Sequence, residues 1–236
     1  MHRISALILF TLLLVGQSLR ADQRHYVWTY EYLTVPAGQG EVEVYHTSSA
    51  PRLDRLEGQV SLEQQLELEV GMTDRFDFAI YGVFGQEPDG PFQFKGHKLR
   101  ARYRFGERNR YVVDPLLYLE YKGKPDFSEH ELEAKLIISK DLGLFNISFN
   151  PVLEFENEHG EWEWETGYAL GTSLMLGSTL HLGLEAQGSG HGHYLGPVIA
   201  HGNEHLWVAL GSAFAVSSIK DGASEFQLRL LLGIGL

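Results

Sequence analysis

Polar and apolar residues alternate at period two in one segment after another, from about residue 41 to the end of the chain. The closing stretch shows the pattern, because one face of the strand it predicts carries Phe226, Leu228, Leu230, Leu232, Ile234 and Leu236. The other face carries Gln227, Arg229, Gly233 and Gly235. Successive side chains of a strand point to opposite faces of the sheet. Nearly every segment thus has one aliphatic face, which favours a closed sheet with lipid outside and water inside.

Turn signals divide the body of the chain into about twelve strands. The predicted strands are 41–49, 58–70, 75–86, 92–105, 111–122, 129–140, 143–156, 161–176, 179–187, 194–201, 204–215 and 225–236. Tight turns such as 72–74, 141–143 and 177–178 alternate with longer links, including 50–57 and 216–224. This alternation predicts an all-β, transmembrane, antiparallel up-and-down barrel over residues 41–236, with the tight turns in the periplasm.

The first residues indicate export. A short basic region precedes a continuous apolar run from Ile4 to Val15, and Gly16, Gln17 and Ser18 form a small-x-small pattern. We predict a signal peptide over residues 1–18, with a second cleavage position as late as residue 21; a retained anchor is the alternative. Residues 19–40 are interpreted as a periplasmic lead-in that pairs briefly with the rim of the barrel. The expected location is the outer membrane of a Gram-negative bacterium.

Charge and aromatic content refine this picture. The net charge of −12 argues against nucleic acid as a partner, because phosphate contacts need a basic face. Cysteine is absent, so the sequence offers neither a lipoprotein attachment site nor a disulfide framework. Several aromatic residues fall at predicted strand ends on outward positions, where an interfacial girdle belongs. They are Trp162, Trp164, Phe76, Phe78, Tyr103, Phe105 and Tyr111. A soluble barrel filled with aromatic side chains is the alternative.

The same parity assigns the side chains that face the lumen. The fourth strand sends a basic row inward, formed by Lys98, Arg100, Arg102 and Arg104. Inward carboxylates on the second and sixth strands are Glu63, Glu67, Glu69, Glu131 and Glu133. In one interpretation these residues line a water-filled pore and set its selectivity. In the other, carboxylates such as Asp77, Asp114 and Glu120 neutralise the basic row, and the charges fill the barrel.

Three stretches resemble small outer-membrane transporter-like barrels of unassigned substrate. They are Glu69–Phe76, which contains the turn Gly71-Met72-Thr73-Asp74-Arg75, the hairpin 135–143 followed by Asn150 and Glu154, and the stretch 32–38. The resemblance implies a porin-like passive channel for a small polar or charged solute. It also implies membrane lipid, lipopolysaccharide and the barrel-assembly machinery as partners. Leu236 departs from the aromatic residue that usually ends the assembly signal of such barrels.

Two further kinds of site are weighed against the channel. A lipid hydrolase would need a serine, a histidine and an orienting polar group on the outer surface. His46 and Ser48 share a face, and His181 lies on another strand, but no third member is evident. The pairs His191/His193 and His201/His205 are predicted at opposite ends of the barrel, so no four-ligand metal site is expected. We predict a non-enzyme without cofactor; a surface lipid hydrolase or a non-conducting structural or adhesin barrel remains as an alternative.

Overall fold

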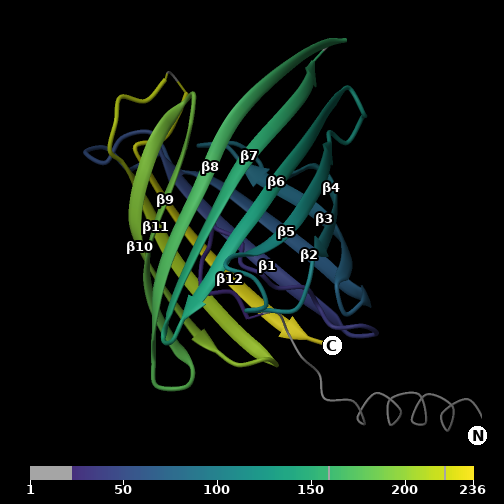
Figure 1. The fold of residues 1–236 in the computed structure, drawn as a ribbon. Helices are drawn as coiled ribbons and strands as arrows, with labels where there is room; N and C mark the ends of the chain where they lie inside the picture. Colours follow the sequence, from purple (N-terminus) through teal and green to yellow (C-terminus); the bar gives the residue numbers. More distant parts are fainter. Residues whose placement is uncertain (1–22, 159, 221) are drawn as a thin grey trace, which may run out of the picture.

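Twelve antiparallel strands close into a single barrel in the computed structural model, which describes residues 23–236 apart from 159 and 221 (Figure 1). The predicted signal peptide lies outside the described residues. The strands are β1 (Gly40–Ala50), β2 (Ser61–Thr73), β3 (Phe76–Gln86), β4 (Gln93–Arg104), β5 (Asp114–Gly123), β6 (Glu129–Leu142), β7 (Phe145–Glu158), β8 (Glu161–Leu176), β9 (Leu180–Ser189), β10 (Gly192–Gly202), β11 (Leu206–Ala215) and β12 (Phe226–Gly235). No helix in this described part is long and apolar enough to cross a membrane.

Sequence neighbours pair all around the barrel, and β1 pairs with β12 to close it. The closing register runs from Glu41 opposite Gly235 to Ala50 opposite Phe226. Each predicted strand has an observed counterpart, with ends shifted by a few residues. The predicted fold class is therefore confirmed. Closure also removes the free edges that an open sheet of this size would expose.

The two faces of the sheet have opposite chemistry. On neighbouring strands Leu66 and Ile80 point outward and are 52% and 47% exposed, whereas the adjacent Glu67 and Tyr81 point inward and are 0% and 5% exposed. An apolar exterior around a polar interior is the arrangement of a barrel that is surrounded by lipid. The predicted girdle residues also lie on the outer surface, where Trp162 and Trp164 are 58% and 69% exposed and Phe76 is half-buried. These rings do not fill the interior, as the soluble-barrel alternative requires.

The two longest connections lie at one end of the barrel, together with the short β7–β8 and β9–β10 connections, and four tight turns lie at the other end, so the predicted alternation of short and long connections holds only in part. One end carries the β2–β3, β6–β7, β8–β9 and β10–β11 turns together with the first residue of β1 and the last of β12. The β4–β5 connection, residues 105–113, lies at the same end and is longer than the other turns there. The β1–β2 and β11–β12 connections, residues 51–60 and 216–225, lie at the opposite end. We call these the turn end and the loop end.

Residues 23–39, the N-terminal segment, run from the lumen to the turn-end rim of the barrel, where Ala37 and Gly38 are exposed. Tyr26, Val27 and Thr29 are each 0% exposed, and Tyr32 is 1% exposed. The prediction of a periplasmic lead-in outside the barrel is wrong for residues 23–35, which occupy the lumen. The physical reason is that several aromatic and aliphatic side chains in a short extended stretch lose exposed apolar surface when the barrel encloses them.

Candidate functional site

Inward side chains of the barrel supply hydrogen bonds to the backbone of the N-terminal segment. The carboxylate of Glu185 on β9 accepts the N–H groups of Val27, Trp28 and Thr29 at 2.9, 3.0 and 2.7 Å. The amide of Asn150 on β7 bonds both backbone groups of Tyr30: its Oδ1 accepts the N–H at 2.6 Å and its Nδ2 donates to the carbonyl at 3.0 Å. A buried backbone needs such partners, so these inward polar side chains replace the strand ladder that the segment lacks.

Glycines in the wall make room for the segment at two close approaches. A Cβ on Gly71 would lie 2.0 Å from the Pro36 carbonyl oxygen, and one on Gly211 would lie 2.4 Å from Val27 Cγ2. Both distances are far shorter than a van der Waals contact, so a larger residue at position 71, or at position 211 opposite Val27, would displace the segment from its position in the lumen. The Gly71 backbone also bonds the segment directly, because Gly38 N–H donates to the Gly71 carbonyl at 2.8 Å.

An ion pair within the segment lies near the turn end. His25 Nδ1 lies 2.7 Å from Glu31 Oε1, and the His25 backbone N–H donates to Glu31 Oε2 at 2.8 Å. The His25 ring stacks on His181 of β9 with ring centroids 3.5 Å apart. Burial lowers the pKa of His25, but the charge and hydrogen bond of Glu31 outweigh it and hold this pKa above its usual value. Burial raises the pKa of Glu31, and His25 more than reverses that effect, so the Glu31 pKa is lowered.

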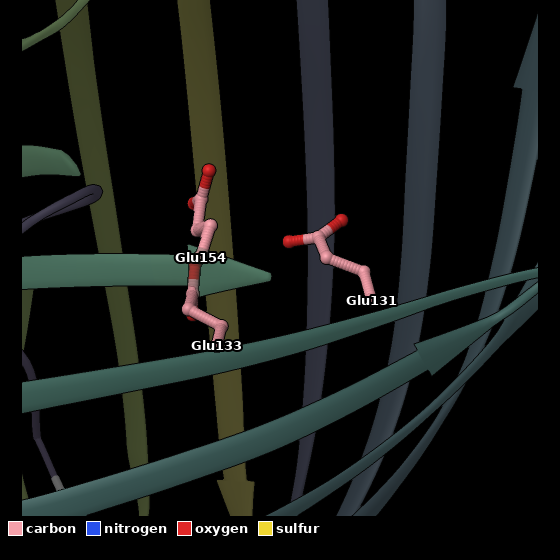
Figure 2. A group of neighbouring side chains, drawn as sticks. All are labelled: Glu131, Glu133 and Glu154. Atoms are coloured by element: carbon pink, nitrogen blue, oxygen red, sulfur yellow. The ribbon is translucent and has the colours of Figure 1, made fainter. Parts of the chain in front are cut away.

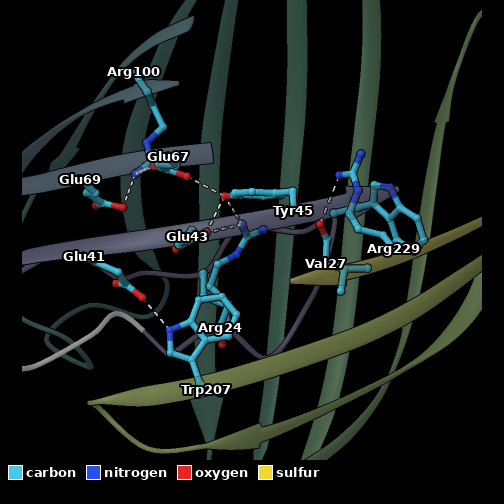
Figure 3. A network of polar contacts seen from close by, with 12 residues as sticks. Arg24, Val27, Glu41, Glu43, Tyr45, Glu67, Glu69, Arg100, Trp207 and Arg229 are labelled. Atoms are coloured by element: carbon cyan, nitrogen blue, oxygen red, sulfur yellow. Dashed lines mark hydrogen bonds and ion pairs between the residues drawn. The ribbon is translucent and has the colours of Figure 1, made fainter. Parts of the chain in front are cut away.

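Buried charges fill the lumen wall around the segment (Figure 3). Arg100 Nη2 lies 2.8 Å from Glu67 Oε1 and also pairs with Glu69. Arg102 pairs with Glu69 and lies 2.8 Å from Asp77 Oδ2. All five side chains are at most 2% exposed. Asp77 in turn accepts the backbone N–H of Val35 at 3.1 Å, so this network extends into the N-terminal segment.

Arg24 connects the segment to β1. Its Nη1 donates to Tyr45 Oη at 3.0 Å and lies 3.7 Å from Glu43 Oε2. Tyr45 Oη is also 2.6 Å from Glu43 Oε2 and 2.8 Å from Glu67 Oε2, so one hydroxyl joins the segment to both strands of the β1–β2 hairpin. The Arg24 guanidinium stacks 4.2 Å over the Tyr30 ring. The turn-end half of the lumen is therefore filled by the N-terminal segment and these ion pairs.

A cavity of about 780 Å³ occupies the other half of the lumen. Its walls reach the loop-end connections, including Lys124, His191 and Gly222. Its floor is formed by the N-terminal segment, which contributes Arg24, Val27, Trp28 and Tyr30. The barrel thus holds a polar cavity that opens at the loop end. On the side of the turn end, residues of the chain's own N-terminal segment close this cavity.

Lysines and carboxylates alternate along the β4–β6 wall of this cavity. Lys98 Nζ lies 3.4 Å from Glu120 Oε1, and Lys122 Nζ lies 2.5 Å from Glu131 Oε1. Figure 2 shows Glu131, Glu133 and Glu154, whose carboxylates gather within 4.8 Å of one another. Lys122 and Lys135 approach Glu133 to 3.4 and 2.8 Å. The lysines balance this acidic group, which is therefore a charged wall and not a distinct cation site.

The residues predicted to line the lumen all point inward, but they divide between two environments. Lys98, Glu63, Glu131 and Glu133 line the cavity. Arg100, Arg102, Glu67 and Glu69 are buried beside the N-terminal segment. Arg104 lies at the turn-end rim, where it donates to the Asp74 carbonyl and lies 5.6 Å from the centre of the Tyr32 ring. The side chains of the basic row point inward, as predicted. Arg100 and Arg102 are neutralised by carboxylates, as in the interpretation in which charges fill the barrel.

Sequence reasoning missed the residues that seat the segment. Glu185 and Asn150 are inward polar residues like many others, so parity alone does not distinguish them. The available signal was the stretch Tyr26-Val27-Trp28-Thr29-Tyr30, which is too rich in large rings for an exposed linker.

The outer surface carries the histidine and serine that were weighed as catalytic candidates. His46 Nε2 lies 3.3 Å from Ser48 Oγ, and His46 Nδ1 lies 3.3 Å from Gln64 Nε2 on β2. Gln64 is the third polar neighbour that the sequence did not reveal. His181 is absent from this group and instead lies inside the barrel against His25. His191 and His193 lie beside the loop-end connection of β9 and β10, and His201 and His205 lie by the turn-end connection of β10 and β11.

Comparison with known proteins connects the chain to outer-membrane barrels through its fold. No family model matches the sequence, and no curated protein matches it. The COG4313 outer membrane channel from Pseudomonas putida F1 superposes with a TM-score of 0.66 at 12% identity, covering 89% of this chain and 100% of that one. The KdgM porin, in complex with disordered oligogalacturonate, gives a TM-score of 0.59 at 8% identity over 83% of this chain and 97% of its own.

The NanC porin gives a TM-score of 0.52 at 7% identity, covering 83% of this chain and 98% of the porin. At these identities the likeness concerns the fold alone. The fold is that of a porin-like outer-membrane β-barrel.

Proposed function

We propose that this protein is a passive outer-membrane channel for a small polar or charged solute. The observation that carries the proposal is the polar cavity of about 780 Å³, which is enclosed by the barrel and open at the loop end. A lumen that only stabilised the barrel would be filled along its whole length. With the tight turns in the periplasm, the cavity faces the cell exterior and receives solute from it.

The N-terminal segment is the barrier of this channel. It forms the cavity floor, and the residues beneath it are closed to water: Glu67, Glu69 and Asp77 are each 0% exposed. Passage of a solute therefore requires the N-terminal segment to move out of its position in the lumen. Lys98, Glu63, Glu131 and Glu133 would then set selectivity at the entrance, and Arg100 and Arg102 would line the deeper path.

A disulfide between the segment and the wall tests this proposal in a chain that lacks cysteine. The variant pair Val27→Cys and Gly211→Cys is suitable, because Val27→Cys replaces the Cγ2 methyl that a Cβ at position 211 would meet at 2.4 Å and places a sulfur beside that position. In planar bilayers the oxidised protein should stay closed, and reduction should restore conductance. The two single variants, treated with the same oxidant, control for damage by either substitution. Equal conductance of the oxidised and reduced forms, with the disulfide verified by mass, would show that the segment is not the barrier.

The channel role itself has a separate test. Deletion of residues 23–37 should leave a barrel that conducts continuously, because the floor of the cavity is removed. Absence of conductance in both the full chain and the deletion variant, with heat-resistant folded barrels in both, would contradict a channel and favour a structural or adhesin role.

A second candidate function rests on the group of Ser48, His46 and Gln64. With the Gln64 amide turned so that its oxygen faces Nδ1, His46 could accept a proton from Ser48, which would then attack a lipid ester. This candidate is the weaker one, because the backbone N–H groups of β1 are engaged in pairing with β2 and β12 and leave no evident oxyanion donor beside Ser48. Release of fatty acid from phospholipid by the detergent-solubilised protein, lost in Ser48→Ala, would establish it.

A further inference from the structure

Arg229 of β12 lies at the floor of the cavity and points into the lumen. Its Nε donates to Thr47 Oγ1 at 2.9 Å. Its Nη1 donates to the Val27 carbonyl at 3.3 Å, and Figure 3 shows this second contact. Its guanidinium carbon lies over the Trp28 ring, 5.4 Å from the ring centroid. The guanidinium is thus fixed from two sides, by a strand neighbour and by the N-terminal segment.

The other cations of the cavity wall differ from Arg229 in one respect. Each has a carboxylate within ion-pair distance in the described part of the chain: Arg24, Lys95, Lys98, Lys122, Lys124 and Lys135. Among the described residues, no carboxylate oxygen lies within about 4 Å of Arg229. Glu63, the carboxylate opposite Thr47 in the β1–β2 register, is instead hydrogen-bonded by Gln65 Nε2 at 2.7 Å.

A guanidinium has five N–H donors, and the contacts to Thr47 and Val27 use two of them. The remaining donors are available at the cavity floor, where they can meet an oxyanion with two parallel hydrogen bonds. Gln227 lies two residues away on the same face of β12, and its Oε1 accepts from Gln187 Nε2 at 3.3 Å. Both amides line the cavity and can bond solute hydroxyl groups.

We propose that Arg229, held on the Trp28 ring, forms a binding subsite for the carboxylate of a small hydroxylated solute. The carboxylate would supply a countercharge at contact distance, whereas among the described residues Glu63 acts on this arginine only from beyond ion-pair distance. The inference rests on the proposed function in that it takes the cavity as the entrance for solute. It adds the solute class, and it explains why one cation of a balanced wall is left without an ion pair.

The test compares gluconate with sorbitol, a six-carbon polyol without the carboxylate, by calorimetry on the full chain in detergent. The wild type should bind gluconate and prefer it over sorbitol. Arg229→Gln should weaken gluconate binding roughly 10- to 100-fold, the range for a hydrogen bond to a charged group. Arg229→Lys should lose less, because an ammonium keeps the charge without the fork. Lys95→Gln, which removes an ion-paired cation from the wall of the same cavity, is the matched control and should bind as the wild type does.

Trp28→Leu provides a variant outside the strands if Arg229→Gln fails to fold; it should weaken gluconate binding several-fold while the barrel stays folded. Equal affinity for gluconate and sorbitol, no binding by the wild type, or unchanged binding in Arg229→Gln would overturn the subsite. An equal loss in Lys95→Gln would do so too, since it would indicate only the general electrostatic field of the cavity. Gluconate binding that depends on Arg229 in a barrel without conductance would support the subsite and contradict the channel, so the two failures are distinguishable.

Discussion

The carboxylate of Glu185 accepts the backbone N–H of Val27 at 2.9 Å, across 158 residues of sequence. Through this contact a strand in the second half of the chain holds a segment that precedes the first strand. The same carboxylate also holds the next two N–H groups. A single acidic side chain therefore fixes the turn of backbone that forms the cavity floor, and the first prediction follows from it.

Glu185→Ala should release the N-terminal segment. It leaves three buried N–H groups without their acceptor, and each costs about 1–3 kcal/mol when it stays unpaired. We expect a higher conductance in planar bilayers and a lower unfolding temperature in detergent. Glu156→Ala, which removes a cavity carboxylate from β7, is the control and should leave the segment seated. Conductance and unfolding temperature that match the wild type would show that Glu185 does not anchor the segment.

The double variant Arg100→Ser and Arg102→Ser should destabilise the barrel. It leaves Glu67, Glu69 and Asp77 buried without their cations, and breaking a buried pair costs roughly 3–5 kcal/mol. The heat needed to unfold the barrel in detergent, followed by its gel shift, measures the loss. Lys95→Ser is the control, because its pair with Glu87 is largely exposed and contributes at most about 1 kcal/mol.

Any conductance that remains in this double variant should shift toward cations, since two positive charges leave the path. A heat-stable double variant with unchanged reversal potential would mean that the two arginines neither brace the barrel nor line the path.

Closure of the channel should depend on pH through His25 and Glu31. The pKa of His25 is raised, so protonated His25 stabilises the N-terminal segment in the lumen fully below the ordinary histidine pKa of about 6.5. This stabilisation is lost as the pH rises through the raised pKa. The pKa of Glu31 is lowered, so ionised Glu31 stabilises the same position of the segment above the ordinary glutamate pKa of about 4.3. This stabilisation is lost as the pH falls through the lowered pKa. We expect the lowest open probability of the channel between about pH 4.3 and about pH 6.5, and more frequent opening in alkaline solution.

The open probability measured as a function of pH in planar bilayers tests this expectation. His25→Gln removes the titrating group and should abolish the alkaline rise while leaving the barrel intact. An alkaline rise of the same size in this variant would assign the effect to another group.

Cysteine labelling should show which end of the barrel faces outward. Asp54→Cys lies in the β1–β2 connection and Leu144→Cys lies in the β6–β7 turn, and both positions are exposed. In intact cells a membrane-impermeant reagent should label position 54 and should reach position 144 only after the outer membrane is permeabilised. Labelling of position 144 alone in intact cells would reverse the orientation and place the cavity toward the periplasm.

The sequence by itself determined the strands, their number and the face on which each side chain lies. These properties are local, because the side-chain direction of a strand alternates strictly and turn residues mark where each strand ends. The inward direction of Arg100 and the outward direction of Trp164 follow from that parity, and both are observed. A charged row on a lipid face would cost several kcal/mol, so the parity of β4 has no plausible alternative.

Only the tertiary structure decided what the inward face meets. A polar face has the same alternating pattern whether it contacts water, an opposing carboxylate or a segment of the same chain. Glu63 and Glu69 lie on one face of β2, yet one lines the cavity and the other is buried against arginines. The difference arises from distances across the lumen and from the path of residues 23–39, both of which depend on closure of the barrel. The free donors of Arg229 have the same origin, because parity aims a side chain inward and only the closed barrel sets which charges come within reach.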